Sequence, residues 1–338
     1  MLDIVASGLA FGAALVASGM YSPYLIASQF TMQRWNMLQT FLTATGCTAL
    51  AVHFLPKLGY AVPPPRPYSP AGILGFPLDG NLIGGALLGA GMSFASSCPG
   101  MVFPQVAMGV PSAPITLAGA VAGGIFWSAV LRPWIASRLR QQITRGHRPG
   151  GSAYSPKTLA QLLDTGRLET LLHYEMLLFV IVVTVAGSAP SAPSALQPIA
   201  GGLVIGAAQL ISLVLRGSLV GVSTCYEHIG DWALYLLGGG RGPHPPTVTL
   251  LFSASMMAGA QLLARQMPQL AVSPGALTRG VASGNAFWGG FLMAVGSRLG
   301  GGCSSGHGIS GMGQMSVASF VSMFAAFAAA FALSRLRV

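Results

Sequence analysis

The sequence predicts an all-α integral membrane protein with about nine transmembrane helices, four short re-entrant segments and two inverted, pseudo-symmetric halves. The first observation is composition: of 338 residues, 52% are hydrophobic and 7% are charged, whereas soluble domains carry about 25% charged residues. The second is the content of 46 glycines and 23 prolines, many within apolar stretches, which is typical of closely packed and interrupted membrane helices. The third is an internal repeat.

The nine candidate spans are mostly apolar stretches near 20 residues long, the length that crosses a bilayer as a helix. The N-terminus lacks a basic region and carries Asp3, so the first span is expected to be a retained helix and not a cleaved signal. The predicted spans cover residues 2–20, 32–55, 80–97, 113–136, 171–188, 196–215, 247–266, 281–299 and 315–334.

Four stretches broken by Gly, Pro and Ser directly follow the first, third, sixth and eighth spans. Irregular backbone at membrane depth is tolerated only where protein or a water-filled cavity satisfies its polar groups, so these stretches are predicted to be re-entrant and to line a passage. In the second of them, Pro99 is expected at the first position of a short helix that Gly109 and Pro111 end, with Cys98 as N-cap. The stretches are 21–30, 98–111, 217–230 and 300–313.

The internal repeat relates the third span to the eighth. LIGGALLGAGMSFASSCPG (82–100) aligns without gaps with FWGGFLMAVGSRLGGGCSS (287–305), and three glycines, a leucine and a cysteine coincide. Equivalent helices are five spans apart, an odd number, so the halves are predicted to be inverted, as in transporters with a site between two repeats. The chain then divides into a first membrane repeat (1–138), a basic loop with a connecting transmembrane helix (139–195) and a second, inverted repeat (196–338).

Cysteines are the candidate reactive residues of the broken stretches. Cys98 and Cys303 occupy equivalent positions of the repeat, and Cys225 lies in the third broken stretch, whereas Cys47 lies mid-helix and is expected in the core. None belongs to a CxxC pair, so neither a disulfide framework nor a zinc site is predicted.

Two motifs, RLGGGCSSGHGISGMG (298–313) and SSCPG (96–100), together with nine spans and four short segments, resemble the YeeE/YedE family of sulfur-compound transporters, which take up thiosulfate. Members are described as hourglass-shaped, with cysteines along a central path that pass the ion by S–H···S contacts. The resemblance therefore implies pathway roles for Cys98 and Cys303, and the SSCPG motif adds Pro99 and Gly100 to the path.

The chain departs from the family pattern near the end of the first helix. The family has a cysteine there, but GMYSPYL (19–25) places Ser22 at this point and contains no thiol. Cys225, in the related segment GVSTCYEHIGD (221–231), is the candidate that serves in its place by pseudo-symmetry.

Polar side chains around Cys303 are further candidates. Arg298 ends an apolar helix, where an intramembrane arginine is a functional candidate, and it would either draw the anion in or brace re-entrant carbonyls. His307 would donate to the anion or serve helix packing, and Ser304 and Ser305 would add hydroxyl donors. A neutral thiol is a weak donor, which suits the soft terminal sulfur of thiosulfate.

The segment 132–169 contains seven Lys and Arg against two acidic residues, and its part 156–170 has the pattern of an interfacial amphipathic helix. One interpretation is a positive-inside anchor, which places this segment and the N-terminus in the cytoplasm. Another is an electrostatic funnel for anions. Some bacterial relatives in the family carry a C-terminal sulfur-carrier domain, and a cytoplasmic sulfur-carrier partner would require the opposite orientation. Nucleic acid is not a predicted partner, because the basic residues lack a soluble domain.

The leading hypothesis is a multi-pass transporter or channel of the cell membrane for thiosulfate or a related sulfur anion. The alternative is a membrane-embedded sulfurtransferase or thiol oxidoreductase that uses Cys98 and Cys303. No haem, flavin, quinone or nucleotide motif is present, so no cofactor is predicted and the chain is expected not to be an enzyme. Cys225, His228 and Asp231 recur every three residues, but without a fourth ligand they predict no metal site.

Overall fold

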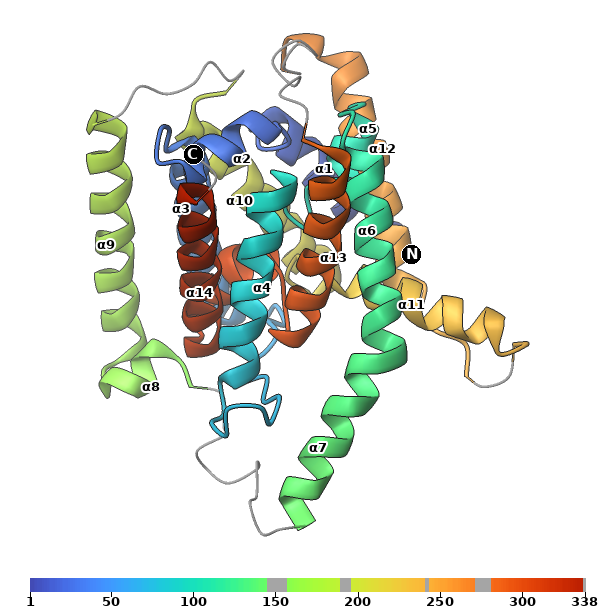
Figure 1. The fold of residues 1–338 in the computed structure, drawn as a ribbon. Coiled ribbons are helices and arrows are strands. Elements are labelled where there is room, and N and C mark those ends of the chain that lie inside the picture. The colour runs from blue at the N-terminus through green and yellow to red at the C-terminus, as the bar shows by residue number, and fades with distance from the viewer. Residues whose placement is uncertain (145–156, 189–195, 241–242, 271–280, 337–338) are drawn as a thin grey trace.

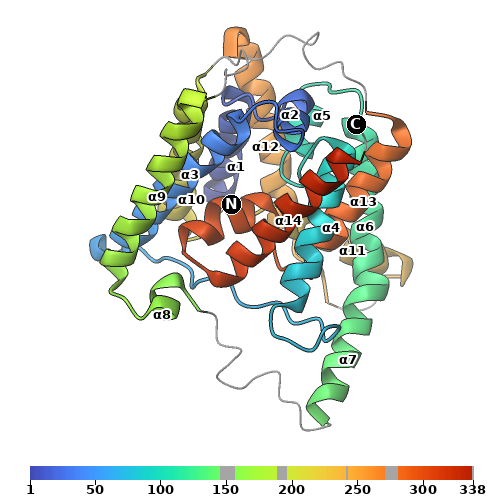
Figure 2. The ribbon, with the colours of Figure 1, turned by 60° about the vertical axis from the view of Figure 1, so that its left-hand side comes forward.

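The computed structural model describes residues 1–144, 157–188, 196–240, 243–270 and 281–336. These residues form helices and connecting segments; the one β-bridge among them, between Thr158 and Ser316, is isolated. The all-α class is therefore confirmed for this part of the chain. Figure 1 shows the helices as a bundle, with α9 at one edge and α11 reaching out from the other. Figure 2 shows α9 beside α3, on which it packs.

Each predicted span is matched by a helix, and each broken stretch contains or leads into a short element. The first half contains α1 (Leu2–Ala17), α2 (Pro23–Phe30), α3 (Asn36–Phe54), α4 (Asp79–Ala95), α5 (Val102–Ala107) and α6 (Ala113–Phe126). The middle contains the π-turn η2 (Trp127–Leu131), α7 (Arg132–Thr144), α8 (Leu159–Leu163) and α9 (Arg167–Ser188). The second half contains α10 (Pro198–Arg216), α11 (Thr224–Leu237), α12 (Val248–Gln266), α13 (Ser283–Leu299), the π-helix η6 (Ser304–Gly311) and α14 (Val317–Arg335).

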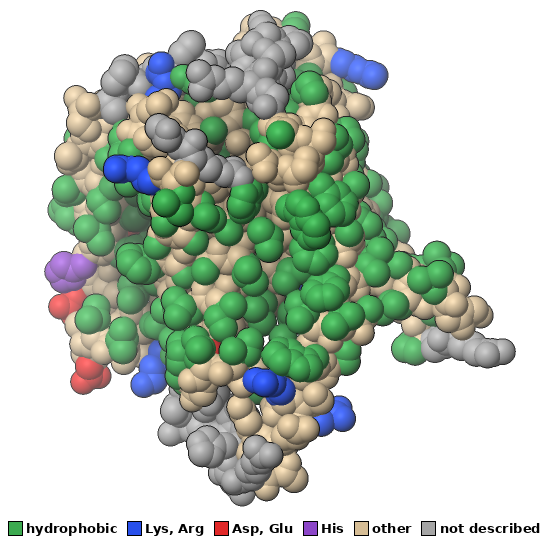
Figure 3. Space-filling model, in the orientation of Figure 1, with side chains coloured by type: hydrophobic (Ala, Val, Ile, Leu, Met, Phe, Trp, Pro, Cys, Tyr) green, Lys and Arg blue, Asp and Glu red, His purple; other side chains and the backbone are tan. Residues whose placement is uncertain are grey.

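Six helical stretches in the described residues are long and apolar enough to cross a membrane, and they include α3, α6 with α7, α9, α10, α12 and α14. Helices α1, α4 and α13 are shorter, so the count of nine spans stays a prediction. Figure 3 shows a broad belt of hydrophobic side chains around one face, with Lys and Arg above and below it. A multi-pass integral membrane protein is the class that these features define.

The structure corrects three local predictions. Helix α5 begins at Val102, with Met101 and not Cys98 as its N-cap, because Pro99 lies in a turn in which the Cys98 carbonyl accepts from the Met101 N–H (2.9 Å). The fourth span continues through the π-turn to Thr144. The predicted amphipathic helix 156–170 is divided between α8 and α9, because Asp164 ends α8 in the left-handed region.

Helices α4 and α13 pack closely through glycine. A Cβ placed on Gly91 would lie 2.6 Å from the Gly289 carbonyl oxygen, and one on Gly84 would lie 2.6 Å from that of Gly296. Approach this close requires residues without a Cβ, as in tightly packed membrane helices. The contact brings together the two apolar helices that precede the broken stretches with Cys98 and Cys303.

Candidate functional site

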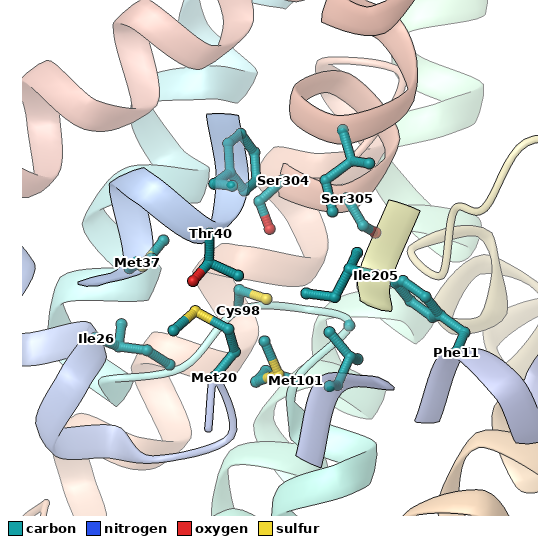
Figure 4. A pocket seen from close by; sticks show the side chains of 14 residues that line it. Phe11, Met20, Ile26, Met37, Thr40, Cys98, Met101, Ile205, Ser304 and Ser305 are labelled. Atoms are coloured by element: carbon teal, nitrogen blue, oxygen red, sulfur yellow. The ribbon is translucent and has the colours of Figure 1, made fainter. Parts of the chain in front are cut away.

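A central cavity lies between the two halves, and Cys98 and Gly100 form part of its wall together with Ser304 and Ser305 of η6. Other walls come from α1, α3 and α10. Figure 4 shows the Cys98 thiol facing the same space as the two serine side chains. The sequence predicted all four residues, and the fold brings them together from segments about 200 residues apart.

The Cys303 thiol lies directly behind this wall. Its sulfur is 3.2 Å from the Ser305 hydroxyl oxygen, a hydrogen-bonding distance at which either atom can donate, and the residue is fully buried. Ser304 and Cys98 line the same cavity. Ser305 therefore connects the buried Cys303 thiol to the wall that contains Cys98.

Cys225 and Ser22 are buried but do not line the central cavity. Tyr226, the residue after Cys225, is fully buried. Its hydroxyl donates to the Pro99 carbonyl at 2.6 Å. This hydrogen bond connects the segment that carries Cys225 to the turn that follows Cys98.

Apart from Thr40, whose hydroxyl donates to the Pro198 carbonyl at 2.9 Å, the rest of the cavity wall is apolar and contains the thioether groups of Met20, Met37 and Met101. Sequence reasoning did not select these methionines. Met20 lies two residues before Ser22, the residue that we compared with the cysteine of the family pattern. The cavity volume is about 40 Å³, which holds only a few water molecules.

Arg298 is paired with a carboxylate. Its guanidinium forms an ion pair with Glu227 and donates to the Thr224 hydroxyl at 3.2 Å, both on α11. Glu227 also pairs with Arg132 at 3.0 Å. This ion-pair network connects α11 to α7 and α13. Among the described residues, the guanidinium of Arg298 has no recorded hydrogen bond to a carbonyl of the segment 300–313.

A residue that sequence reasoning missed, Arg66, makes contacts of that kind. Its Nε donates to the Gly306 carbonyl and its Nη1 to the Gly301 carbonyl, both at 3.1 Å. Burial lowers the pKa of the Arg66 guanidinium, but arginine starts so far above neutral that the group stays charged. The Pro-rich context PPPRP (63–67) carries no signal that this arginine reaches across to Cys303.

His307 uses both ring nitrogens within the protein. Nε2 is 2.9 Å from the Gly300 carbonyl oxygen and Nδ1 is 3.0 Å from the Ser319 hydroxyl oxygen. The carbonyl can only accept, so Nε2 carries the proton and Nδ1 accepts from Ser319 in the neutral ring. The structure therefore favours the packing role over donation to an anion.

Equivalent hydrogen bonds hold the broken stretches of each half together. Gln105 of α5 donates to the Tyr21 carbonyl at 3.0 Å, in the first broken stretch. Ser310 of η6, at the equivalent position of the repeat, donates to the Val220 carbonyl at 2.7 Å, in the third. Each cysteine-bearing segment is thus fixed to the other broken stretch of its own half.

The described residues contain no cluster of His, Cys, Asp and Glu that would hold a metal ion. The chemistry that converges on the cavity consists of the Cys98 thiol, the hydroxyls of Thr40, Ser304 and Ser305, and methionine thioethers. Such groups bind weakly and reversibly, which suits passage and release. Arg66 lies behind, hydrogen-bonded to the Cys303 loop.

A helical membrane bundle with a narrow internal cavity between its halves is the architecture of a transport protein. The chain belongs to the sulphur transport family, whose model matches residues 17–332. This match confirms the family that the two motifs indicate.

The chain is also similar to two shorter proteins of Xylella fastidiosa, each called a probable transporter. The protein of strain Temecula1 / ATCC 700964 is 31% identical over 124 residues, which make up 37% of this chain and 81% of the relative. The protein of strain 9a5c is 30% identical over the same lengths. Both relatives are therefore less than half as long as this chain.

Proposed function

We propose that the protein carries thiosulfate or a related sulfur anion through the central cavity, along a path that includes Cys98, Ser304, Ser305 and Cys303. The observation that supports this proposal is the meeting of the Cys98 thiol with the Ser304 and Ser305 hydroxyls, with the Cys303 thiol one hydrogen bond behind. Sulfur transport is the role of the family, and the cavity is where the sulfur chemistry of this chain is concentrated.

The donor set fits a dianion with one soft sulfur. A thiol is a weak donor and a hydroxyl a stronger one, so the thiols would contact the terminal sulfur while the serines contact the oxygens. The apolar wall makes no strong contact with the ion, which lowers the barrier to release. Sulfate has only hard oxygens and would gain nothing from the thiols.

The helix packing supports the proposal that residues 1–138 and 196–338 are inverted repeats joined by 139–195. If α1, α3, α4 and α6 correspond to α10, α12, α13 and α14, each major contact has a counterpart. Helix α1 packs on α12 as α10 packs on α3, and α4 packs on α14 as α13 packs on α6. Relatives less than half as long as this chain fit a unit of one repeat.

The same correspondence gives the four broken stretches their proposed places, as two pairs that enter the membrane from opposite faces. Cys225 and Ser22 belong to the outer part of the path, since both are buried near it without lining the narrow cavity. Orientation in the cell membrane and a cytoplasmic sulfur-carrier partner remain predictions of the family resemblance.

The test is uptake of ³⁵S-labelled thiosulfate into sealed proteoliposomes. Wild-type protein should accumulate label above empty liposomes, and the Cys98→Ala, Cys303→Ala double variant should do so much more slowly at equal reconstituted protein. Equal uptake by both proteins would remove the thiol path and leave a channel. No uptake by the wild type, together with turnover of thiosulfate in detergent, would favour the sulfurtransferase alternative.

A further inference from the structure

A second, larger cavity lies away from the central one, between the end of α3, the segment 62–65, α8, the start of α9 and the residues after η6. We call it the α8 cavity; its volume is about 470 Å³. Its polar lining, among the residues that the structure describes, consists of Lys57, Arg167, His53, Thr158 and Gln314, and these include no Asp or Glu. The cavity therefore has an excess of positive charge.

Among the described residues, neither cation of the α8 cavity, Lys57 or Arg167, takes part in an ion pair. Both line the same cavity as His53. Two unpaired cations that share a concave wall raise the local concentration of anions.

Two buried polar atoms at this cavity lack partners. Gln314 is 4% exposed, and its Nε2 donates to the Pro63 and Pro64 carbonyls at 2.7 and 3.0 Å. Its Oε1 has no hydrogen-bond partner, and neither has Nε2 of His53. Buried polar atoms are almost always satisfied in native proteins, so a ligand or its bound water is expected to complete both.

We propose that the α8 cavity is an oxyanion site, in which a sulfate-, thiosulfate- or phosphate-type group is held by Lys57 and Arg167. A water bound to the anion, or the acidic hydrogen of a phosphate, donates to Oε1 of Gln314. A free anion and the phosphate of a lipid headgroup share this chemistry. The site does not depend on the proposed thiol path. Its wall, however, is continuous with the segment that carries Arg66, which holds the Cys303 loop.

The test measures electrostatic potential inside the cavity. Val62, which lines the cavity, is replaced in the full chain by cysteine, Val62→Cys. Purified protein in detergent is treated with a sulfonate-bearing or an ammonium-bearing methanethiosulfonate, and labelling at position 62 is followed by mass spectrometry. The anionic reagent should be favoured, and Lys57→Gln with Arg167→Gln should lower the anion-to-cation rate ratio about tenfold.

Two controls keep the result specific. The charge-conserving pair Lys57→Arg and Arg167→Lys should leave the ratio at Val62→Cys nearly unchanged. At Leu74, which is 55% exposed and does not line the cavity, a Leu74→Cys reporter should give a ratio that does not respond to the glutamine pair.

Protection identifies the source of the oxyanion. Slower labelling of Val62→Cys in sodium thiosulfate or phosphate than in sodium chloride of equal ionic strength indicates a free anion. Protection only in vesicles that contain phosphatidylglycerol, and not in phosphatidylcholine alone, indicates a lipid phosphate. A ratio unaffected by the glutamine pair, without protection under any condition, overturns the proposal. None of these readings requires transport, so they stand or fall separately from the central path.

Discussion

The two cysteine-bearing segments, 98–111 and 300–313, come after helices that share a glycine pattern, but they are held in the bundle by different means. The first forms a turn and the short helix α5, and neutral groups hold it through Gln105 and Tyr226. The second contains the π-helix η6, and the charged Arg66 donates hydrogen bonds to two carbonyls of this segment, those of Gly301 and Gly306. Segments at equivalent positions of a repeat can therefore be held by different kinds of contact, neutral hydrogen bonds in one and a charged arginine in the other.

The two thiols differ accordingly. Cys98 contributes to the wall of the central cavity, whereas Cys303 is fully buried and reaches the cavity through Ser305. An ion in the cavity would contact Cys98 first, and would contact Cys303 only if the loop that Arg66 holds changes position. Cys98 is thus expected to contact the ion directly, and the Cys303 loop is the segment expected to move.

The largest expected effect concerns the faces from which the two segments enter. Met108→Cys and Met312→Cys, each in a background without reactive native thiols, should label with an impermeant thiol reagent from opposite sides of the membrane. The reason is that inverted repeats place equivalent segments at opposite faces. The measurement is labelling of right-side-out and inside-out vesicles. If both positions label from one side, the two segments are not related by an inverted repeat.

Removal of the arginine should have the next largest effect. Arg66→Gln leaves two carbonyls without a charged donor, and each such hydrogen bond is worth about 1.5–3 kcal/mol. Thiosulfate uptake is expected to fall by more than about tenfold, and the detergent-solubilised protein should unfold at a lower temperature. Arg66→Lys should recover part of both losses, because a lysine keeps the charge but not the two-pronged geometry.

The matched control for Arg66 is Arg298→Gln. Its known contacts are Glu227 and Thr224 on α11, so it should destabilise the helix packing without altering the Cys303 loop. If Arg298→Gln reduces uptake more than Arg66→Gln at equal folded yield, Arg66 is not the arginine on which the Cys303 loop depends for transport.

A smaller effect separates the two thiols. A small neutral thiol reagent should modify Cys98 at least several-fold faster than Cys303, because only Cys98 contributes to the cavity wall. Thiosulfate should slow the reaction of Cys98 by occupying the same space. Mass spectrometry of the two peptides measures both rates in one sample. Faster modification of Cys303 would reverse the order in which the ion meets the thiols.

Long apolar runs made the helices predictable, since a span must hide its backbone from lipid. The repeat likewise selected Cys98, and the motifs around the two repeat-related cysteines added Gly100, Ser304 and Ser305, the other three predicted residues that line the central cavity. The sequence did not reveal Arg66, because its partners lie 235 and 240 residues away and no local pattern encodes such a contact. For the same reason Arg298 was placed on a helix end without its partner Glu227. The late start of α5 depends on a local turn at Pro99, which span length does not determine.

The smallest effect tests how symmetric the scaffold beneath both segments is. A Cβ at Gly91 would lie 2.6 Å from the Gly289 carbonyl oxygen, and one at Gly289 would lie 2.9 Å from that of Gly91. Such overpacking costs about 1–3 kcal/mol, so Gly91→Ala and Gly289→Ala should lower thermal stability by similar amounts. Gly187→Ala, in α9 with nothing within 4 Å, is the control and should have little effect. Similar losses of stability in the two variants would show that α4 and α13 contribute equally to their contact. The different exposure of Cys98 and Cys303 to the cavity would then arise in the segments that carry them. A loss in only one variant would instead attribute this difference to the crossing of α4 and α13.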